Sequence, residues 1–166
     1  MADILIVDDQ DRTIDLCRRG LPEHRYRGPA RSWREAADQL ARARGRVDLV
    51  LLDVHFDIAP EELEGWNADL SKRDVDRLKR TQGLHILERL RSRYPDLPVI
   101  VMTAAEDVRL EEASFGEKIE EYTYFLNDDD MDARALKGQI ASIVEATSGR
   151  MAEGPVYWGR SLAMRR

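Results

Sequence analysis

The chain has 166 residues, of which 43% are hydrophobic and 35% are charged. These proportions are typical of a soluble globular protein, and the length suffices for one domain with a full core. The formal net charge of -6 argues against direct contact with nucleic acid. The single cysteine, Cys17, excludes an internal disulfide and a thiolate metal cluster, and we expect it to be a reduced core thiol.

The N-terminal stretch "MADILIVDD" meets acid directly after its apolar run and has no basic region before it. We therefore expect no secretory signal peptide. No apolar run approaches the roughly 20 residues that a membrane-spanning helix needs. Together these features predict a cytoplasmic protein without a membrane anchor.

Four short apolar runs are continuous and rich in branched residues, which is typical of strands buried on both faces of a parallel sheet. They are Ile4–Val7, Val47–Val54, Leu97–Thr103 and Tyr122–Leu126. A weaker strand is predicted near Tyr26–Arg31. Helical spacing of apolar residues predicts helices between the strands. The helices are expected around Ile14–Leu21, Ser32–Arg44, Gly83–Tyr94 and Met131–Ala146.

The alternation of strands and helices predicts an α/β doubly wound sheet with right-handed crossovers. Residues 56–82 interrupt this alternation, because they are far too many for an ordinary connection between a strand and a helix. Pro60 can open a helical turn that Gly65 closes, and Leu78 continues the apolar spacing of the next helix. We predict a partly helical insertion that lengthens the third helix at its N-terminal end, with Trp66 as its anchor.

Polar side chains gather where the predicted strands end. Asp8 and Asp9 follow the first strand, Asp53 closes the third, and Thr103 closes the fourth. In an open parallel sheet these carboxyl ends share the edge at which ligands bind. Three carboxylates that lie close together repel one another unless a hard cation such as Mg²⁺ binds among them. A carboxylate beside Mg²⁺ can become an aspartyl phosphate, and the Thr103 hydroxyl can hydrogen-bond a phosphoryl oxygen.

The runs "ILIVDD", "DLVLLD", "PVIVMTA" and "YFL" occur in this order and resemble the receiver domain of bacterial two-component response regulators. The resemblance covers roughly residues 3–147. It implies a flavodoxin-like α/β fold, in which a five-stranded parallel sheet of order 2-1-3-4-5 has helices on both faces.

The same resemblance implies roles for individual residues. Asp53 would be the phosphoacceptor. Mg²⁺ would be bound by Asp53, by Asp9 directly, by Asp8 through water and by the backbone carbonyl of His55. The residues implied in switching are the Thr103 hydroxyl and the aromatic ring of Tyr124.

One position departs from the family pattern. Receivers usually follow the fifth strand with Lys-Pro, and the lysine binds a phosphoryl oxygen, whereas this chain has Asn127 and Asp128. Phosphoryl transfer depends on positioning and on neutralising charge, so this loss should slow phosphorylation, weaken its coupling to the switch, or both. A basic residue of the insertion, Lys72, Lys79 or Arg80, could supply the missing cation.

Two charged segments leave alternatives open. Asp128–Asp130 either cap the last helix and interact with its dipole or help to hold a cation. The insertion is either a solvated surface or a functional element, which would be a lid beside Asp53 or a surface for a partner.

The tail, Val156–Arg166, is similar to the opening of the AAA+ ATPase domain of sigma-54-dependent activators, where a Gly-x-Ser-x-x-Met run begins the domain. No phosphate-binding loop follows, so the chain cannot hydrolyse ATP by that route. These resemblances divide the chain into a receiver domain (1–147), a linker (148–155) and the start of a truncated AAA+ domain (156–166).

The function that these features imply is regulatory and not enzymatic. A sensor histidine kinase would phosphorylate Asp53, and the change would act on the chain's own AAA+ domain through a homodimer surface built from the fourth helix, fifth strand and fifth helix. One alternative is a pseudo-receiver that is never phosphorylated and acts as a protein-interaction module. Another is a Mg²⁺-dependent phosphatase of the haloacid-dehalogenase class, which is disfavoured because His55 stands where its general acid would be.

Overall fold

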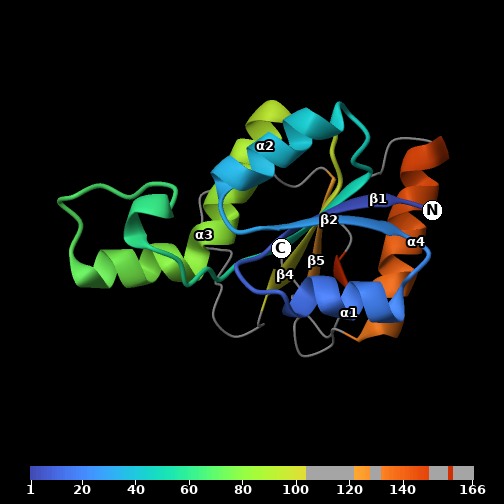
Figure 1. Cartoon of the computed structure of the whole chain (residues 1–166), viewed down its shortest axis with the longest axis horizontal. Coiled ribbons are helices and arrows are strands. Elements are labelled where there is room, and N and C mark those ends of the chain that lie inside the picture. The colour runs from blue at the N-terminus through green and yellow to red at the C-terminus, as the bar shows by residue number, and fades with distance from the viewer. Residues whose placement is uncertain (104–121, 128–131, 150–156, 159–166) are drawn as a thin grey trace, which may run out of the picture.

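The computed structural model of the chain describes residues 1–103, 122–127, 132–149 and 157–158 (Figure 1). The described strands pair in parallel in one sheet of order β2-β1-β3-β4-β5-β6. The described elements are β1 Asp3–Val7, α1 Arg12–Gly20, β2 Arg25–Ala30, α2 Trp33–Ala43, β3 Leu49–Asp53, the 3₁₀ helix η1 Pro60–Glu62, α3 Lys72–Arg93, β4 Val99–Thr103, β5 Thr123–Asn127, α4 Ala133–Gly149 and β6 Tyr157–Trp158. The predicted order 2-1-3-4-5 is therefore confirmed, and a short sixth strand is added beside β5.

The sheet is covered on both faces, with α2 and α3 on one face and α1 and α4 on the other (Figure 1). Alternate residues of each strand point to opposite faces, which is why the strands read as continuous apolar runs. In β1, for example, Leu5 and Val7 pack toward α2 and α3, whereas Ile4 and Ile6 pack toward α1 and α4. The core therefore has two layers, one on each side of the sheet.

The predicted lengthening of the third helix is confirmed. The helix α3 begins at Lys72, and the Ser71 and Asp74 side chains form a reciprocal capping box at its N-terminus. This first part of the helix projects away from the sheet (Figure 1).

The chain between β3 and α3 folds back on the helix. Pro60 opens the helical turn of η1, as predicted, and Gly65 has a φ of +84°. The anchor differs from the prediction, because Leu63 is buried whereas Trp66 is only half-buried. An ion pair of 3.0 Å between Glu64 and Arg89 joins the turn to α3. The burial of Leu63 and the ion pair of Glu64 therefore attach this turn to the rest of the fold.

The opposite end of α3 is joined to β5 by a buried arginine. The Arg91 guanidinium donates hydrogen bonds to the carbonyls of Leu97 and Tyr122 and to the Thr123 hydroxyl. Its burial lowers the pKa of Arg91 to about 10. The helix is thus fixed to the sheet at its C-terminal end.

Several predictions fall wholly or partly outside the described residues. These include residues 104–121, between the fourth and fifth strands, where the fourth helix of the implied homodimer surface would lie, and most of the predicted linker and AAA+ segment. The described part of that segment is β6, where Tyr157 pairs with Phe125 of β5. The domain boundaries therefore remain predictions. Among the described helices, none combines the length and the apolar character that crossing a membrane requires.

Candidate functional site

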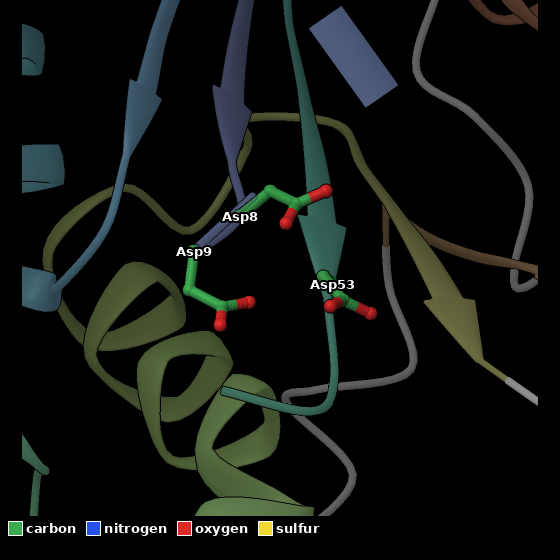
Figure 2. Close-up of side chains that lie close together, drawn as sticks. All are labelled: Asp8, Asp9 and Asp53. Atoms are coloured by element: carbon green, nitrogen blue, oxygen red, sulfur yellow. The ribbon is translucent and has the colours of Figure 1, made fainter. Parts of the chain in front are cut away.

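An acidic cluster lies where β1 and β3 end. The two strands are neighbours in parallel register, with Val7 paired to Leu52, so Asp8 and Asp9 emerge beside Asp53. One carboxylate oxygen from each of the three aspartates lies within 4.8 Å of the others (Figure 2). The sheet topology therefore brings together the three acids that the sequence singled out.

Asp8 is the most enclosed of the three, with 4% of its surface exposed. Its Oδ1 accepts a hydrogen bond of 2.7 Å from the Gln10 N–H, and its Oδ2 accepts one of 2.6 Å from the Thr13 hydroxyl. Hydrogen bonds to a carboxylate stabilise its charged form and fix its orientation. Asp8 is thus positioned by the turn that leads into α1.

Asp9 and Asp53 are half-buried and each accepts a hydrogen bond from a backbone N–H. The Asp9 Oδ2 accepts from Asp57 at 3.0 Å, and the Asp53 Oδ1 accepts from Val54 at 2.8 Å. Both donors belong to the segment that follows β3. That segment therefore orients both of these carboxylates.

The geometry of the cluster fits Mg²⁺. Magnesium prefers hard oxygen ligands at about 2.1 Å, so two ligands on opposite sides of the ion lie about 4.2 Å apart. The 4.8 Å spread of the three oxygens is only slightly larger than this distance. A small inward movement of the half-buried carboxylates, or a water between the ion and Asp8, would complete such a site. Asp8, Asp9 and Asp53 are thus the residues that would hold the ion.

Backbone hydrogen bonds attach α3 to the segment after Asp53. The Phe56 N–H donates to the Lys79 carbonyl, and the Gly83 N–H donates to the Val54 carbonyl, both at 2.9 Å. His55 lies between these two attachments with its side chain exposed. These two hydrogen bonds fix the course of the backbone on both sides of His55. The metal-binding role of the His55 carbonyl stays a prediction.

The predicted switch residues lie on the neighbouring strands. Asp53 pairs with Met102, so the next residue, Thr103, is at the same edge of the sheet, where it is buried. Tyr124 is buried in the core layer formed with α1 and α4, and this burial raises the pKa of its hydroxyl. The switching roles of both residues remain predictions.

The position of the usual lysine lies at this edge too. Asn127 is the last residue of β5 and its backbone pairs with Thr103. The asparagine side chain and the aspartates Asp128–Asp130 lie outside the described residues. The last helix, α4, is capped by Asp132, whose Oδ1 accepts a hydrogen bond of 2.6 Å from the Ala135 N–H, so the predicted capping role of Asp128–Asp130 is taken by another aspartate. The predicted role of these acids in holding a cation stays a prediction.

The three basic residues proposed from the insertion have different positions. The Lys79 ammonium lies 2.6 Å from the Asp57 Oδ1, and this contact lowers the pKa of Asp57. Lys72 and Arg80 are exposed and form no ion pair within the described ranges. Of the three, Lys79 is therefore the one connected to the acidic cluster.

Sequence reasoning missed two groups that position the site. One is the Thr13 hydroxyl, for which the signal was a small hydroxyl residue in the first turn of the helix after the paired acids. The other is the backbone N–H of Asp57, which carries no sequence signal because every residue other than proline has such a donor. Backbone contacts of this kind become visible only in the folded chain.

No protein-family model and no curated protein matches the chain. Solved structures do match. NtrX from Brucella abortus is 23% identical with a TM-score of 0.60, and the match covers 89% of this chain and 27% of the NtrX chain. This chain therefore spans about a quarter of the NtrX length.

Two isolated receivers match over most of their own length. The signal receiver domain of an HD domain-containing protein from Pseudomonas fluorescens Pf-5 is 21% identical with a TM-score of 0.61, covering 89% of each chain. A CheY-like response regulator receiver domain protein from Methanospirillum hungatei JF-1 is 18% identical with a TM-score of 0.58, covering 89% of this chain and 97% of that one. The chain therefore has the receiver-domain fold of response regulators.

Proposed function

We propose that the chain is a cytoplasmic phosphoacceptor receiver domain in which Asp53 is phosphorylated in a Mg²⁺-dependent reaction. The observation that carries the proposal is the cluster of Asp8, Asp9 and Asp53, whose oxygens lie within 4.8 Å of one another at the carboxyl ends of β1 and β3. A buried or half-buried cluster of like charges is costly unless a cation offsets it. The three aspartates offer the oxygen donors that bind such a cation, and they lie at the edge where parallel sheets bind ligands.

In the proposed reaction an Asp53 carboxylate oxygen forms a bond to phosphorus. The bond between phosphorus and the donor breaks at the same time, and its electron pair leaves with the donor, which is a phosphohistidine nitrogen of a sensor kinase or the acyl oxygen of a small acyl phosphate. Bound Mg²⁺ would supply positive charge that offsets the charge of the carboxylates and the phosphoryl oxygens. The Val54 N–H orients the Asp53 carboxylate, and Thr103 is the hydroxyl at the same edge.

The proposed output is regulation of a sigma-54-dependent activator. The similarity of Val156–Arg166 to the start of an AAA+ domain and the structural likeness to NtrX support this assignment. A change at Asp53 and Thr103 would reach the surface near Tyr124 and alter a homodimer, which would restrain or release the downstream ATPase. In this proposal the receiver is a regulatory substrate of its kinase and catalyses no reaction on a separate substrate.

A second candidate function is supported by the residue at the end of β5. Asn127 carries no charge where receivers usually have a lysine. A chain that cannot neutralise the phosphoryl group would act as a pseudo-receiver, which binds partners without being phosphorylated. The two functions differ in whether the domain takes up a phosphoryl group.

Intact mass after incubation with Mg²⁺ and acetyl phosphate separates them. The parent chain is expected to gain the mass of one phosphoryl group, and the Asp53→Asn variant is expected to gain none. Uptake by both chains would show that another residue is modified. No uptake by the parent, together with no Mg²⁺-dependent binding of beryllium fluoride, would favour the pseudo-receiver.

A further inference from the structure

In the proposed phosphorylated state, the site would have no cationic side chain on β5, because that strand ends at Asn127 where receivers usually continue with a lysine. A phosphoryl group carries a charge of about -1.5 to -2, and Asp8 and Asp9 add two more negative charges beside it. One Mg²⁺ offsets only part of this charge. A positively charged side chain that reaches the phosphoryl group would therefore strengthen its binding, as charge-assisted hydrogen bonds do.

The helix α3 lies against the segment that carries Asp53 (Figure 2). The hydrogen bond from the Phe56 N–H to the Lys79 carbonyl fixes the backbone of residue 79 at the third residue after Asp53. The hydrogen bond from Gly83 to Val54 fixes the helix one turn further on. Residue 79 therefore has a defined position beside the site. It belongs to the part of α3 that the insertion adds on the N-terminal side of Gly83.

The side chain of Lys79 is directed along the same segment. Its ammonium contacts the Asp57 carboxylate at 2.6 Å, and the backbone N–H of Asp57 donates to the Asp9 Oδ2 at 3.0 Å. The lysine thus lies next to a residue that itself touches the acidic cluster. Its side chain is 24% exposed, so most of it is held by neighbouring atoms.

The partner of Lys79 holds it only loosely. The Asp57 side chain is 73% exposed, and ion pairs with so much solvent access contribute little net stability. A phosphoryl group on Asp53 would offer more negative charge and three acceptor oxygens. Rotation of the flexible lysine side chain would let the ammonium exchange the Asp57 carboxylate for such a phosphoryl group.

Another described cation near this edge is less suited to the role. The Arg31 guanidinium pairs with Asp11 at 2.9 Å, directly after β2. The strand β1 separates β2 from β3, so Arg31 is one strand further from Asp53 than the segment to which Lys79 is attached. Lys79 is bonded through its own backbone to the chain that follows Asp53.

We infer that Lys79 supplies the cation that the end of β5 lacks, by leaving Asp57 and binding the phosphoryl group on Asp53. The inference rests on the proposed function and deepens it, because it assigns a role in phosphorylation to the insertion. The insertion would then be part of the phosphoryl site and not only a solvated surface. Lys79 would contribute to the phosphorylated state and would have little part in binding Mg²⁺ alone.

Three variants test this assignment. Lys79→Met keeps the apolar part of the side chain and removes the charge. Asp57→Asn weakens the hold on Lys79 and keeps the backbone N–H that donates to Asp9. Lys72→Met removes an exposed lysine from the start of the same helix and is the matched control. Each chain is titrated with Mg²⁺ alone and with beryllium fluoride at saturating Mg²⁺, and binding is measured by calorimetry.

Lys79→Met is expected to weaken beryllium fluoride binding about tenfold or more, since hydrogen bonds to charged groups are the strong ones. Its affinity for Mg²⁺ alone should be unchanged or higher, because a nearby positive charge has been removed. Asp57→Asn should bind beryllium fluoride as well as the parent or better, and Lys72→Met should equal the parent.

Two results would overturn the inference while leaving the proposed function intact. In the first, Lys79→Met binds beryllium fluoride as the parent does. In the second, Lys79→Met and Asp57→Asn weaken binding equally, which would mean that the ion pair only supports the loop. A parent chain that binds no beryllium fluoride would overturn the proposed function, and this inference would fail with it.

Discussion

Gly83 of α3 lies directly against the backbone of Asp53. A β-carbon at residue 83 would stand 2.0 Å from the Asp53 carbonyl oxygen and 2.6 Å from the Val54 α-carbon. Backbone atoms cannot move aside as the end of a flexible side chain can. The absence of a side chain at residue 83 therefore allows the helix to approach the candidate phosphoacceptor.

Replacing Gly83 with alanine should separate α3 from this segment. We expect Gly83→Ala to lower the free energy of unfolding by about 3 kcal/mol, the upper part of the range for overpacked cores. The displaced segment should also weaken Mg²⁺ binding, because it orients Asp9 and Asp53. Urea unfolding and a Mg²⁺ titration of the same variant measure the two effects.

The matched control is Gly138→Ala in α4. A β-carbon at residue 138 would meet no atom within 4 Å. The same exchange should therefore raise the free energy of unfolding by roughly 0.5–1 kcal/mol, because alanine is the better helix former. If both variants were more stable than the parent, α3 could not pack as closely against the backbone of Asp53 as described.

The effect of Asp9→Asn on the free energy of unfolding should be opposite in sign with and without Mg²⁺. Without Mg²⁺, Asp9→Asn removes like-charge repulsion and should raise the free energy of unfolding by about 1 kcal/mol. With Mg²⁺ at about 100 times its dissociation constant, the parent should gain about 2.7 kcal/mol and the variant much less. The parent should therefore be the less stable chain without Mg²⁺ and the more stable chain with it, as measured by urea unfolding.

Asp38→Asn on the exposed side of α2 is the control for the loss of one negative charge. This variant should gain as much stability from Mg²⁺ as the parent does. If Mg²⁺ stabilised the Asp9→Asn and Asp38→Asn chains equally, the ion would not bind at the cluster of Asp8, Asp9 and Asp53.

The hydroxyl of Thr13 should contribute to the stability of the site in the absence of metal. Thr13→Val keeps the shape of the side chain but removes the 2.6 Å hydrogen bond to the buried Asp8 carboxylate. Hydrogen bonds to charged groups contribute roughly 1.5–3 kcal/mol, so we expect a loss of about 2 kcal/mol in the free energy of unfolding.

Thr81→Val provides the comparison for this prediction. The Thr81 hydroxyl donates to the Arg77 carbonyl within α3, a local contact that adds little to helix stability. Its replacement should change the free energy of unfolding by less than about 0.5 kcal/mol. An equal loss of unfolding free energy in the two valine variants would mean that the hydrogen bond to Asp8 stabilises the fold no more than the local hydrogen bond of Thr81 does.

The strands and the acidic edge were predictable because both follow from the geometry of a buried parallel sheet. Strands buried on two faces must be apolar throughout, so the run ending at Val7 and the run ending at Asp53 stand out in the sequence. Parallel strands also place their carboxyl ends together, which is why Asp8 and Asp9 could be expected beside Asp53. The half-exposed edge strand β2 gave a weaker signal, since only one side of it has a neighbouring strand.

The contacts that support the site could not be predicted in the same way. The sequence offered Lys72, Lys79 and Arg80 as equivalent cations, and only the docking of α3 on the segment after Asp53 separates Lys79 from the others. The requirement for glycine at residue 83 arises from a backbone approach between parts of the chain far apart in sequence. Such tertiary contacts leave no periodicity to detect.

The buried thiol of Cys17 should make the chain sensitive to alkaline pH. Burial raises the pKa of Cys17 from its ordinary value of 9.0 to about 12. Between these values the unfolded chain has lost the thiol proton and the folded chain keeps it. The stability that the thiol contributes is therefore complete below pH 9 and is lost progressively as the pH rises toward 12. At pH 10.5 the loss should be about 2 kcal/mol.

Cys17→Ala has no thiol to ionise, so the comparison isolates this contribution. The variant should be less stable than the parent at pH 8, because a buried group has been shortened, and the difference should shrink by about 2 kcal/mol at pH 10.5. Tyr26, whose pKa burial also raises, titrates in both chains and largely cancels in the difference. Urea unfolding under reducing conditions at the two pH values measures both chains. A difference that stays constant between them would mean that the folded chain ionises Cys17 at an ordinary pKa, and that the thiol is not enclosed between α1 and the sheet.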